Sequence, residues 1–291
     1  MRHVIALDAS GTETRAALVA LDGTPLYETR RPTTTTPPLG LAEDLRGHGR
    51  KHFGAQAEAA ALATGPGRTD PRTRELLSRA LGDVPVVLEH GVRAAALAEA
   101  RIGAGRERDR FLFVSPDRTV TGAIVLDGRI EAGAGHAGAI GHLTVRPDGR
   151  PCPCGRRGCL DTLASTAAIT RAWRRATGTA TADALACARA ADAGDKAAAE
   201  VWRTAVDALA DALATALTIL DPGTVIVGGA LARTGETLLT PLRRAVTDRL
   251  TFQKRPAVVA AALDDAAYRG AGLLARDLVA GSVPAAAPDA L

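Results

Sequence analysis

Apolar and polar positions along this chain predict helices and strands in turn. The clearest helix is predicted from Asp195 to Leu220, where apolar side chains recur every three or four residues and form one stripe. The stripe consists of Trp202, Val206, Leu209, Leu213, Leu217 and Leu220. Asp70-Pro71 predicts the start of a second helix, because aspartate caps helix N-termini and proline fits the first helical position.

Short apolar runs that end at turn residues predict the strands. Residues 3–7 and 15–21 form two such runs, and Asp22-Gly23 after the second is a hairpin signal. Further strands are predicted at 84–88, 111–114, 123–126, 224–227 and 258–263, and further helices at 92–102, from 229 to about 250, and at 266–278. Residues 55–63 fit a helix or an edge strand equally well, and Thr33–Pro38 forms a Thr/Pro loop. Strands that alternate with helices indicate an α/β protein.

The composition narrows the class of protein. Apolar residues make up 46% of the 291 residues but aromatic residues only 3%, so alanine and aliphatic side chains must fill the interior. This length is sufficient for two lobes, each with its own core. The net charge of +4 is scattered, which favours a solvated surface over a nucleic-acid-binding face. The sequence has no apolar run long enough for a membrane span and no signal-peptide layout at its start, so we expect a cytoplasmic protein.

One segment, residues 142–161, has the spacing of a metal site. Its candidate ligands, in the pattern H-x9-C-x-C-x4-C, are His142, Cys152, Cys154 and Cys159. Zinc prefers four tetrahedral ligands from thiolate and imidazole groups, and a Cys3His set is typical of a structural site. In the cytoplasm, clustered cysteines indicate metal ligands before disulfides. The alternative, free thiols in an exposed loop, would leave them open to oxidation, so we predict one bound zinc ion.

The residues around these ligands resemble those of a known family. Gly141-His142 followed by Cys152-Pro-Cys154-Gly-Arg-Arg-Gly-Cys159-Leu-Asp161 is similar to the zinc signature of the ROK family of bacterial sugar kinases and sugar-responsive repressors. Asp8-Ala-Ser-Gly-Thr12 is similar to the family's first phosphate loop, and Asp221–Ala230 to its adenosine-side strand and glycine turn. The resemblance implies the two-lobed actin-like/hexokinase (ribonuclease H-like) ATPase fold, an α/β architecture with ATP and sugar between the lobes.

The resemblance also implies how the chain is divided and which residues bind nucleotide. Residues 1–93, completed by a C-terminal helix at 266–280, would form one lobe, and residues 94–265, with the zinc loop at 142–161, the other. The tail at 282–291 is rich in alanine and proline and is expected to be disordered. The implied Mg-ATP contacts are Asp8, Gly11, Thr12, Gly228 and Gly229. Both loops also fit ordinary tight turns, so nucleotide binding is one of two interpretations.

The position of the family's catalytic base has no side chain in this sequence. The family pattern E-N-D-x-N-A-A-A-x-x-E corresponds to residues 89–99, and its aspartate, which takes the proton from the sugar hydroxyl, falls on Gly91. His90 and Asp161 are substitute candidates, although neither stands at the position of the aspartate. Loss of a general base typically lowers the rate by about two to four orders of magnitude.

Other positions of the family pattern have changed as well. Ser10 replaces the second glycine of the first phosphate loop. In the second phosphate loop, G-T-G-I-G in the family, Pro116 provides no N–H group and Asp117 would repel a phosphate. The glutamate that holds the sugar falls on Ala139, and the closing glutamate is the shorter Asp161.

These changes lead to three hypotheses. We expect a catalytically inactive ROK homologue, a pseudokinase with structural zinc that forms a homodimer and binds a sugar-like ligand or a protein partner, but neither nucleic acid nor a membrane. The alternative is an active ATP-dependent kinase of unusual specificity for a hexose or amino sugar. A transcriptional regulator is less favoured, because ROK repressors carry a winged helix before the first phosphate-loop strand and this sequence begins in that strand.

Overall fold

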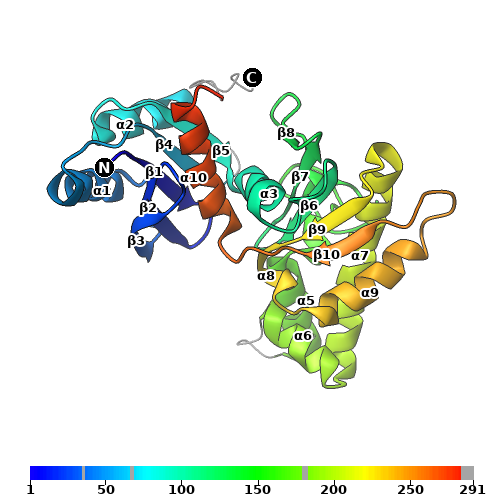
Figure 1. Ribbon diagram of the computed structural model, residues 1–291. Coiled ribbons are helices and arrows are strands. Elements are labelled where there is room, and N and C mark those ends of the chain that lie inside the picture. The colour runs from blue at the N-terminus through cyan, green and yellow to red at the C-terminus, as the bar shows by residue number, and fades with distance from the viewer. Residues whose placement is uncertain (35–36, 66–68, 179–182, 283–291) are drawn as a thin grey trace. The chain divides into compact units, whose positions relative to one another are not determined.

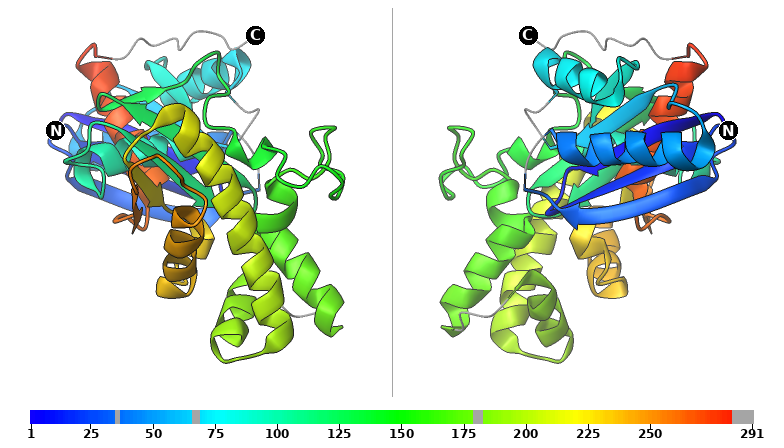
Figure 2. Two further views of the ribbon diagram at one scale, coloured as in Figure 1. Left: turned by 90° about the vertical axis from the view of Figure 1, so that its right-hand side faces the viewer. Right: turned by 90° about the vertical axis from the view of Figure 1, so that its left-hand side faces the viewer.

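The computed structural model describes residues 1–34, 37–65, 69–178 and 183–282. The chain forms two compact units, Met1–Arg101 with Leu263–Leu291 and Ile102–Ala262 (Figures 1 and 2). The sequence-based boundary at residues 93 and 94 falls inside a helix, and the folding of each predicted lobe as a unit stays a prediction. Two residues of the predicted Thr/Pro loop, 35 and 36, and residues 283–291 of the predicted disordered tail lie outside the described residues.

The first unit is built on a five-stranded mixed sheet. Its strands are β1 (His3–Ala9), β2 (Glu13–Ala20), β3 (Pro25–Pro32), β4 (Ala60–Thr64) and β5 (Val86–His90), in the order β3-β2-β1-β4-β5. Strand β1 pairs antiparallel with β2 and parallel with β4, and β2 and β3 form the hairpin predicted at Asp22-Gly23. The helices are α1 (Leu39–Phe53), α2 (Pro71–Leu81), α3 (Gly91–Ile102) and α10 (Ala266–Val279).

Strand β1 is buried on both faces, which explains its continuous apolar run. Ile5 and Leu7 belong to the core cluster that includes the apolar residues of α1 and α2. Ala6 points to the other face, where a Cβ atom at Gly272 of α10 would lie 3.8 Å from its side chain. Small residues at this contact let α10 pack closely on the sheet.

The second unit contains a second five-stranded mixed sheet and most of the helices. Its strands are β6 (Phe111–Pro116), β7 (Val120–Leu126), β8 (Arg129–Glu131), β9 (Thr224–Val227) and β10 (Ala257–Ala260), in the order β10-β9-β6-β7-β8. The helices are η1 (Ile140–His142, a 3-10 turn), α4 (Asp161–Ala164), α5 (Thr166–Thr177), α6 (Ala184–Asp192), α7 (Lys196–Leu220), α8 (Gly229–Ala232) and α9 (Glu236–Thr247). Helix α7 packs against α4, α5, α6 and α9, so its apolar stripe lies at the centre of the helical part.

The strongest sequence patterns are confirmed. Helix α7 begins after Asp195, whose carboxylate accepts a hydrogen bond from the N–H of Ala198 at 2.8 Å. Helix α2 begins at Pro71 after Asp70, which caps Thr73 in the same way at 2.9 Å. No helix in the described ranges is long and apolar enough to cross a membrane.

Two of the secondary-structure predictions made from the sequence are wrong. Within the segment 55–63, residues 60–63 belong to β4, a fully buried strand between β1 and β5, and residues 55–59 lie outside helices and strands, so neither the helix nor the edge-strand interpretation holds. The helix predicted from residue 229 to about 250 is wrong in its extent, because the chain breaks between α8 and α9. The break contains Gly235, the N-cap of α9, whose positive φ of 59° cannot be part of a continuous right-handed helix.

Candidate functional site

Four potential metal ligands converge in the loop between η1 and α4. The ligand atoms of His142, Cys152, Cys154 and Cys159 all lie within 4.8 Å of one another. The Sγ atom of Cys152 is 3.7 Å from Nδ1 of His142, and the Sγ atoms of Cys154 and Cys159 are 3.6 Å apart. One imidazole and three thiols at such distances can hold a tetrahedral metal ion. The structure thus brings together all four predicted metal ligands.

The backbone of this metal loop (residues 142–161) folds back on itself as a short ribbon. Thr144 forms a β-bridge with Cys159, and the N–H of Gly158 donates to the carbonyl oxygen of Arg150 at 2.8 Å. Gly158 has a φ of 64°, and a Cβ atom there would lie 1.4 Å from the carbonyl oxygen of Arg146. Only glycine fits this position, so its place in the sequence is explained by the ribbon that carries the ligands.

The thiols of the metal loop differ in the direction in which their pKa is shifted. Burial, with hydrogen bonds from the Cys159 thiol to the neighbouring sulfurs, raises the pKa of Cys159 to about 12. A hydrogen bond from the backbone N–H of Arg156 lowers the pKa of the exposed Cys154. A divalent cation between the sulfurs would favour the thiolate form at both positions, because the metal ion is the largest local charge.

The end of β1 and the loop that leads to β2 contain the first group of predicted nucleotide residues: Asp8, Gly11 and Thr12. One carboxylate oxygen of Asp8 accepts two hydrogen bonds from Ser10, from the N–H at 3.0 Å and from the hydroxyl at 2.6 Å. Burial raises the pKa of Asp8, and the hydrogen bonds from Ser10 offset part of this effect. Ser10 therefore engages the carboxylate that the resemblance assigns to Mg-ATP.

Gly91, at the position of the family's catalytic base, is the first residue of α3 and is buried. A Cβ atom at Gly91 would lie 2.6 Å from Cβ and 2.8 Å from Oγ of Ser10, closer than real Cβ atoms approach other atoms. A side chain at position 91 and the serine at position 10 therefore exclude each other in this arrangement.

The first substitute candidate, His90, is half-buried at the end of β5. Its backbone N–H donates to the carboxylate of Glu89 at 2.6 Å, and Glu89 forms an ion pair with Arg93 at 2.8 Å. These contacts fix the backbone at His90 and place a paired carboxylate beside it.

The turn between β6 and β7 brings a carboxylate to the second group of nucleotide residues. One oxygen of Asp117 accepts from the N–H of Ala230 at 3.2 Å, directly after the predicted contacts Gly228 and Gly229. The other oxygen accepts from the N–H of Arg118 at 2.7 Å. A carboxylate thus lies against the backbone N–H that directly follows the predicted Gly228-Gly229 turn.

The second substitute candidate, Asp161, lies at the start of α4. Its carboxylate accepts from the N–H of Val120 at 2.7 Å, which joins the end of the metal loop to β7. Ala139, at the position of the sugar-holding glutamate, directly precedes η1 and has no polar side chain. The carboxylate of Asp161 thus makes a structural contact within the second unit.

Comparisons with known proteins agree with this picture. A model of the ROK family matches residues 74–278 of the chain. This chain belongs to the ROK family. It is 35% identical to the glucokinase of Thermotoga maritima over 228 residues, which cover 72% of this chain and 71% of that protein. It is 28% identical to the N-acetylglucosamine repressor of Escherichia coli O6:H1 over 198 residues, 64% of this chain and 49% of the repressor.

The fold of this ROK protein is shared with a solved kinase structure. The ROK hexokinase from Thermus thermophilus superposes with a TM-score of 0.83 at 30% identity, covering 96% of this chain and 99% of that one. The predicted family and the predicted α/β fold of ROK hexokinases are therefore confirmed. The relatives include both a kinase and a repressor, so the family alone does not decide between these functions.

The sequence did not reveal the contacts between residues that lie far apart along the chain. Ser10 and Gly91 both differ from the family pattern, but nothing in the sequence places one against the other. The contact between Asp117 and Ala230 spans 113 residues, and the ion pair of Arg146 with Asp211 spans 65. An alignment in which such positions vary together is the signal that would have identified these pairs.

Proposed function

We propose that this ROK protein does not transfer phosphate and acts by binding a ligand or a protein partner. The observation that carries the proposal is the packing of Gly91 against Ser10, because position 91 has no side chain to act as a base and a carboxylate placed there would overlap Ser10. A hexokinase-type reaction needs a carboxylate that takes the proton from the attacking hydroxyl as phosphate is transferred. Without this group, transfer to a sugar would be slower by about two to four orders of magnitude.

The phosphate-binding positions support the same proposal. Asp117 accepts the hydrogen bond of the Ala230 N–H, and Ser10 engages Asp8, the residue proposed to hold Mg²⁺. Both contacts satisfy polar groups within the chain that a kinase would leave available for Mg-ATP. Contacts at Gly11, Thr12 and the Gly228-Gly229 turn stay predictions.

The metal loop is proposed to bind one structural zinc ion through His142, Cys152, Cys154 and Cys159. Two features support this assignment: the donor set is the one zinc prefers, and its four ligand atoms already converge. The ion would neutralise the thiolates and fix the ribbon between them. A structural zinc site can contribute on the order of 10 kcal/mol to folding, which is sufficient reason to keep it without catalysis.

A sugar or sugar derivative is the ligand class that we propose. Its support is the family itself, since the relatives named above are a glucokinase and a repressor named for N-acetylglucosamine. The repressor shows that the family is not confined to enzymes, and a regulatory role is compatible with a chain that binds without phosphorylating. A homodimer and a cytoplasmic location stay predictions.

The proposal is tested by measuring ADP release from Mg-ATP with a panel of hexoses and amino sugars. We expect no sugar to raise ADP release above the rate without sugar, while at least one sugar raises the midpoint of thermal unfolding in a concentration-dependent way. Sugar-stimulated ADP release that scales with protein concentration would contradict the absence of phosphate transfer. A full panel without any shift in unfolding would contradict the ligand class.

An active kinase of unusual specificity is the second candidate, and the 35% identity to a glucokinase favours it. It would need His90 or Asp161 as the base. The discriminating variants are His90→Ala and Asp161→Asn, measured against the unchanged protein in the same ADP assay. A sugar-stimulated rate that disappears in one of them supports this candidate, whereas a rate that neither change affects leaves it without a base.

A further inference from the structure

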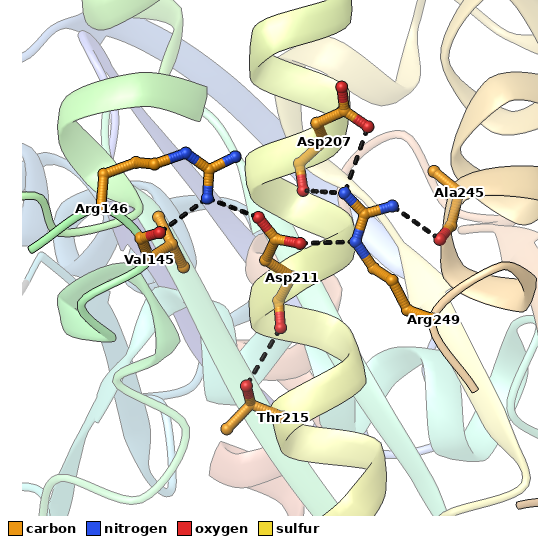
Figure 3. Close-up of polar contacts among 7 residues, drawn as sticks. All are labelled: Val145, Arg146, Asp207, Asp211, Thr215, Ala245 and Arg249. Carbon is orange, nitrogen blue, oxygen red and sulfur yellow. Dashed lines mark hydrogen bonds and ion pairs between the residues drawn. The ribbon is translucent and has the colours of Figure 1, made fainter. Parts of the chain in front are cut away.

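A network of ion pairs joins the metal loop to helices α7 and α9 (Figure 3). Nη1 of Arg146, in the metal loop, donates to one carboxylate oxygen of Asp211 on α7 at 2.6 Å. The other oxygen of Asp211 accepts from Nε of Arg249, which follows the end of α9. Asp211 therefore connects two arginines that come from segments on either side of α7 in the sequence.

Arg146 is also part of the ribbon that carries the metal ligands. Its N–H donates to the carbonyl oxygen of Gly158 at 3.1 Å, and its own carbonyl oxygen accepts from Gly149 at 2.8 Å. Its guanidinium donates to the carbonyl oxygen of Val145 at 2.6 Å as well as to Asp211. A displacement of the ribbon would therefore pull on the ion pair with α7, and a displacement of α7 would pull on the ribbon.

Arg249 makes the corresponding contacts on the other side of Asp211. It donates to the backbone and side chain of Asp207 on α7 at 3.3 Å and 3.2 Å, and to the carbonyl oxygen of Ala245 on α9 at 2.8 Å. Arg249 and Asp207 line a groove of about 570 Å³ between α6, α7 and α9. Trp202 also lines this groove, and its indole N–H donates to the carbonyl oxygen of Thr237 on α9 at 2.9 Å.

The charge on Asp211 holds this network together. Burial alone would raise the pKa of Asp211, but hydrogen bonds from Arg249 and Arg146 outweigh it and lower the pKa. The carboxylate is thus ionised at neutral pH. Its side chain is 29% exposed, so removing the charge leaves two arginines facing each other in partly buried surroundings. The three residues should therefore respond as a unit when any one of them is changed.

We propose that Arg146 and Asp211 are positioning residues which couple the metal loop to the groove between α7 and α9. The inference rests on the zinc binding proposed above. Metal in the loop orders the ribbon, the ribbon holds Arg146 on Asp211, and Asp211 orients Arg249 at the groove. Coupling of this kind is reciprocal, so a change at the groove also alters how tightly the loop holds its metal.

The first test is the rate at which zinc-loaded protein releases zinc to a colorimetric chelator. We expect Asp211→Asn and Arg146→Ala to release zinc about three- to tenfold faster than the unchanged protein, a modest effect for partly exposed partners of a metal loop. Arg110→Ala, which removes an exposed ion pair with Asp127 and lies outside the residues that line the groove, is the matched control and should release zinc at the unchanged rate. Arg146→Lys keeps the positive charge, so its rate of zinc release should be close to that of the unchanged protein.

The second test uses Trp202 as a reporter of the groove. In a Trp173→Phe background Trp202 is the only tryptophan, because the chain contains two. We expect removal of zinc to change the emission of Trp202 in this background, and to leave it unchanged when Arg146→Ala is added. Full zinc content with equal release rates in all variants would overturn the coupling alone. Unchanged protein that binds no zinc would overturn the zinc site and the coupling together.

Discussion

The metal loop and the loop between β1 and β2 have diverged to different degrees. The metal loop has four candidate metal ligands, one imidazole and three thiols, together with Gly158, which its ribbon requires. Beside the other loop, at the end of β1, Asp8 remains, but Ser10 engages its carboxylate and also occupies the space beside Gly91. A metal site contributes to folding, whereas a catalytic base contributes only to the reaction. We therefore expect loss of the base to leave the fold intact and loss of a metal ligand to destabilise it.

The largest effect is expected from a change in the metal loop. Cys159→Ser removes a fully buried sulfur ligand, and zinc binding should fall sharply along with several kcal/mol of stability, since a structural zinc contributes on the order of 10 kcal/mol. Metal content and the midpoint of thermal unfolding measure both effects. The matched control is Cys187→Ala, a buried cysteine outside the loop, which should retain a full complement of zinc. Equal zinc content in both variants would contradict the ligand assignment.

Two glycines of the metal loop give the next effect. Gly158→Ala places a Cβ atom 1.4 Å from a carbonyl oxygen at a φ of 64°, so we expect a loss of about 3 kcal/mol or more together with weaker zinc binding. Gly155→Ala meets no atom within 4 Å at a φ of 91° and should cost only about 1 kcal/mol. Chemical denaturation of the zinc-loaded variants separates the two, and similar costs would show that the ribbon tolerates side chains.

The packing of Ser10 on Gly91 predicts a smaller, non-additive effect. Gly91→Asp alone should destabilise the protein by about 1–3 kcal/mol, because the new side chain overlaps Ser10. In combination with Ser10→Gly the same change should cost clearly less, since the space is then free. A double-mutant cycle from urea unfolding measures this difference. Additive costs would mean that the two positions do not compete for space.

The smallest effect on stability is expected at the N-terminus of α2, which lies outside both loops. Asp70 caps α2, and hydrogen bonds from the side chain and N–H of Thr73 lower its pKa. A lowered pKa stabilises the folded state above the unfolded pKa, near 4, and this stabilisation is lost as the pH falls through the folded pKa. Asp70→Ala should therefore cost about 1 kcal/mol at pH 7 and progressively less in acid. Thermal unfolding across this pH range measures the trend, and a cost that grows in acid would contradict the cap.

Local patterns explain which parts of the fold could be predicted. Helices α2 and α7 carry caps and apolar stripes within their own residues, and the metal ligands lie in one short segment. Helix α1 was not predicted because it contains several glycines. One of them, Gly49, is required by a distant residue, since a Cβ atom there would lie 2.8 Å from the ring of His3. Gly49 is thus explained by tertiary packing, which cannot be predicted from the local sequence pattern.

The same limit applies to the candidate site. The sequence identifies Gly91 and Asp117 as departures from the family pattern, because the neighbouring residues fix the alignment. It does not identify the contacts of Ser10 with Gly91 or of Asp117 with Ala230, which join positions far apart in the chain. In the structure, Ser10 occupies the space beside Gly91 where the side chain of a base would lie. Asp117 accepts the hydrogen bond from the N–H of Ala230 beside the Gly228-Gly229 turn.

The most direct test of retained metal binding without phosphate transfer is a single-turnover experiment. Zinc-loaded protein in excess is mixed with Mg-ATP labelled at the γ-phosphate and with glucose or N-acetylmannosamine, and labelled sugar phosphate is followed over time. We predict one zinc per chain and no sugar phosphate beyond that formed without protein. Stoichiometric formation of a labelled sugar phosphate by the same zinc-loaded sample would contradict the proposed loss of catalysis.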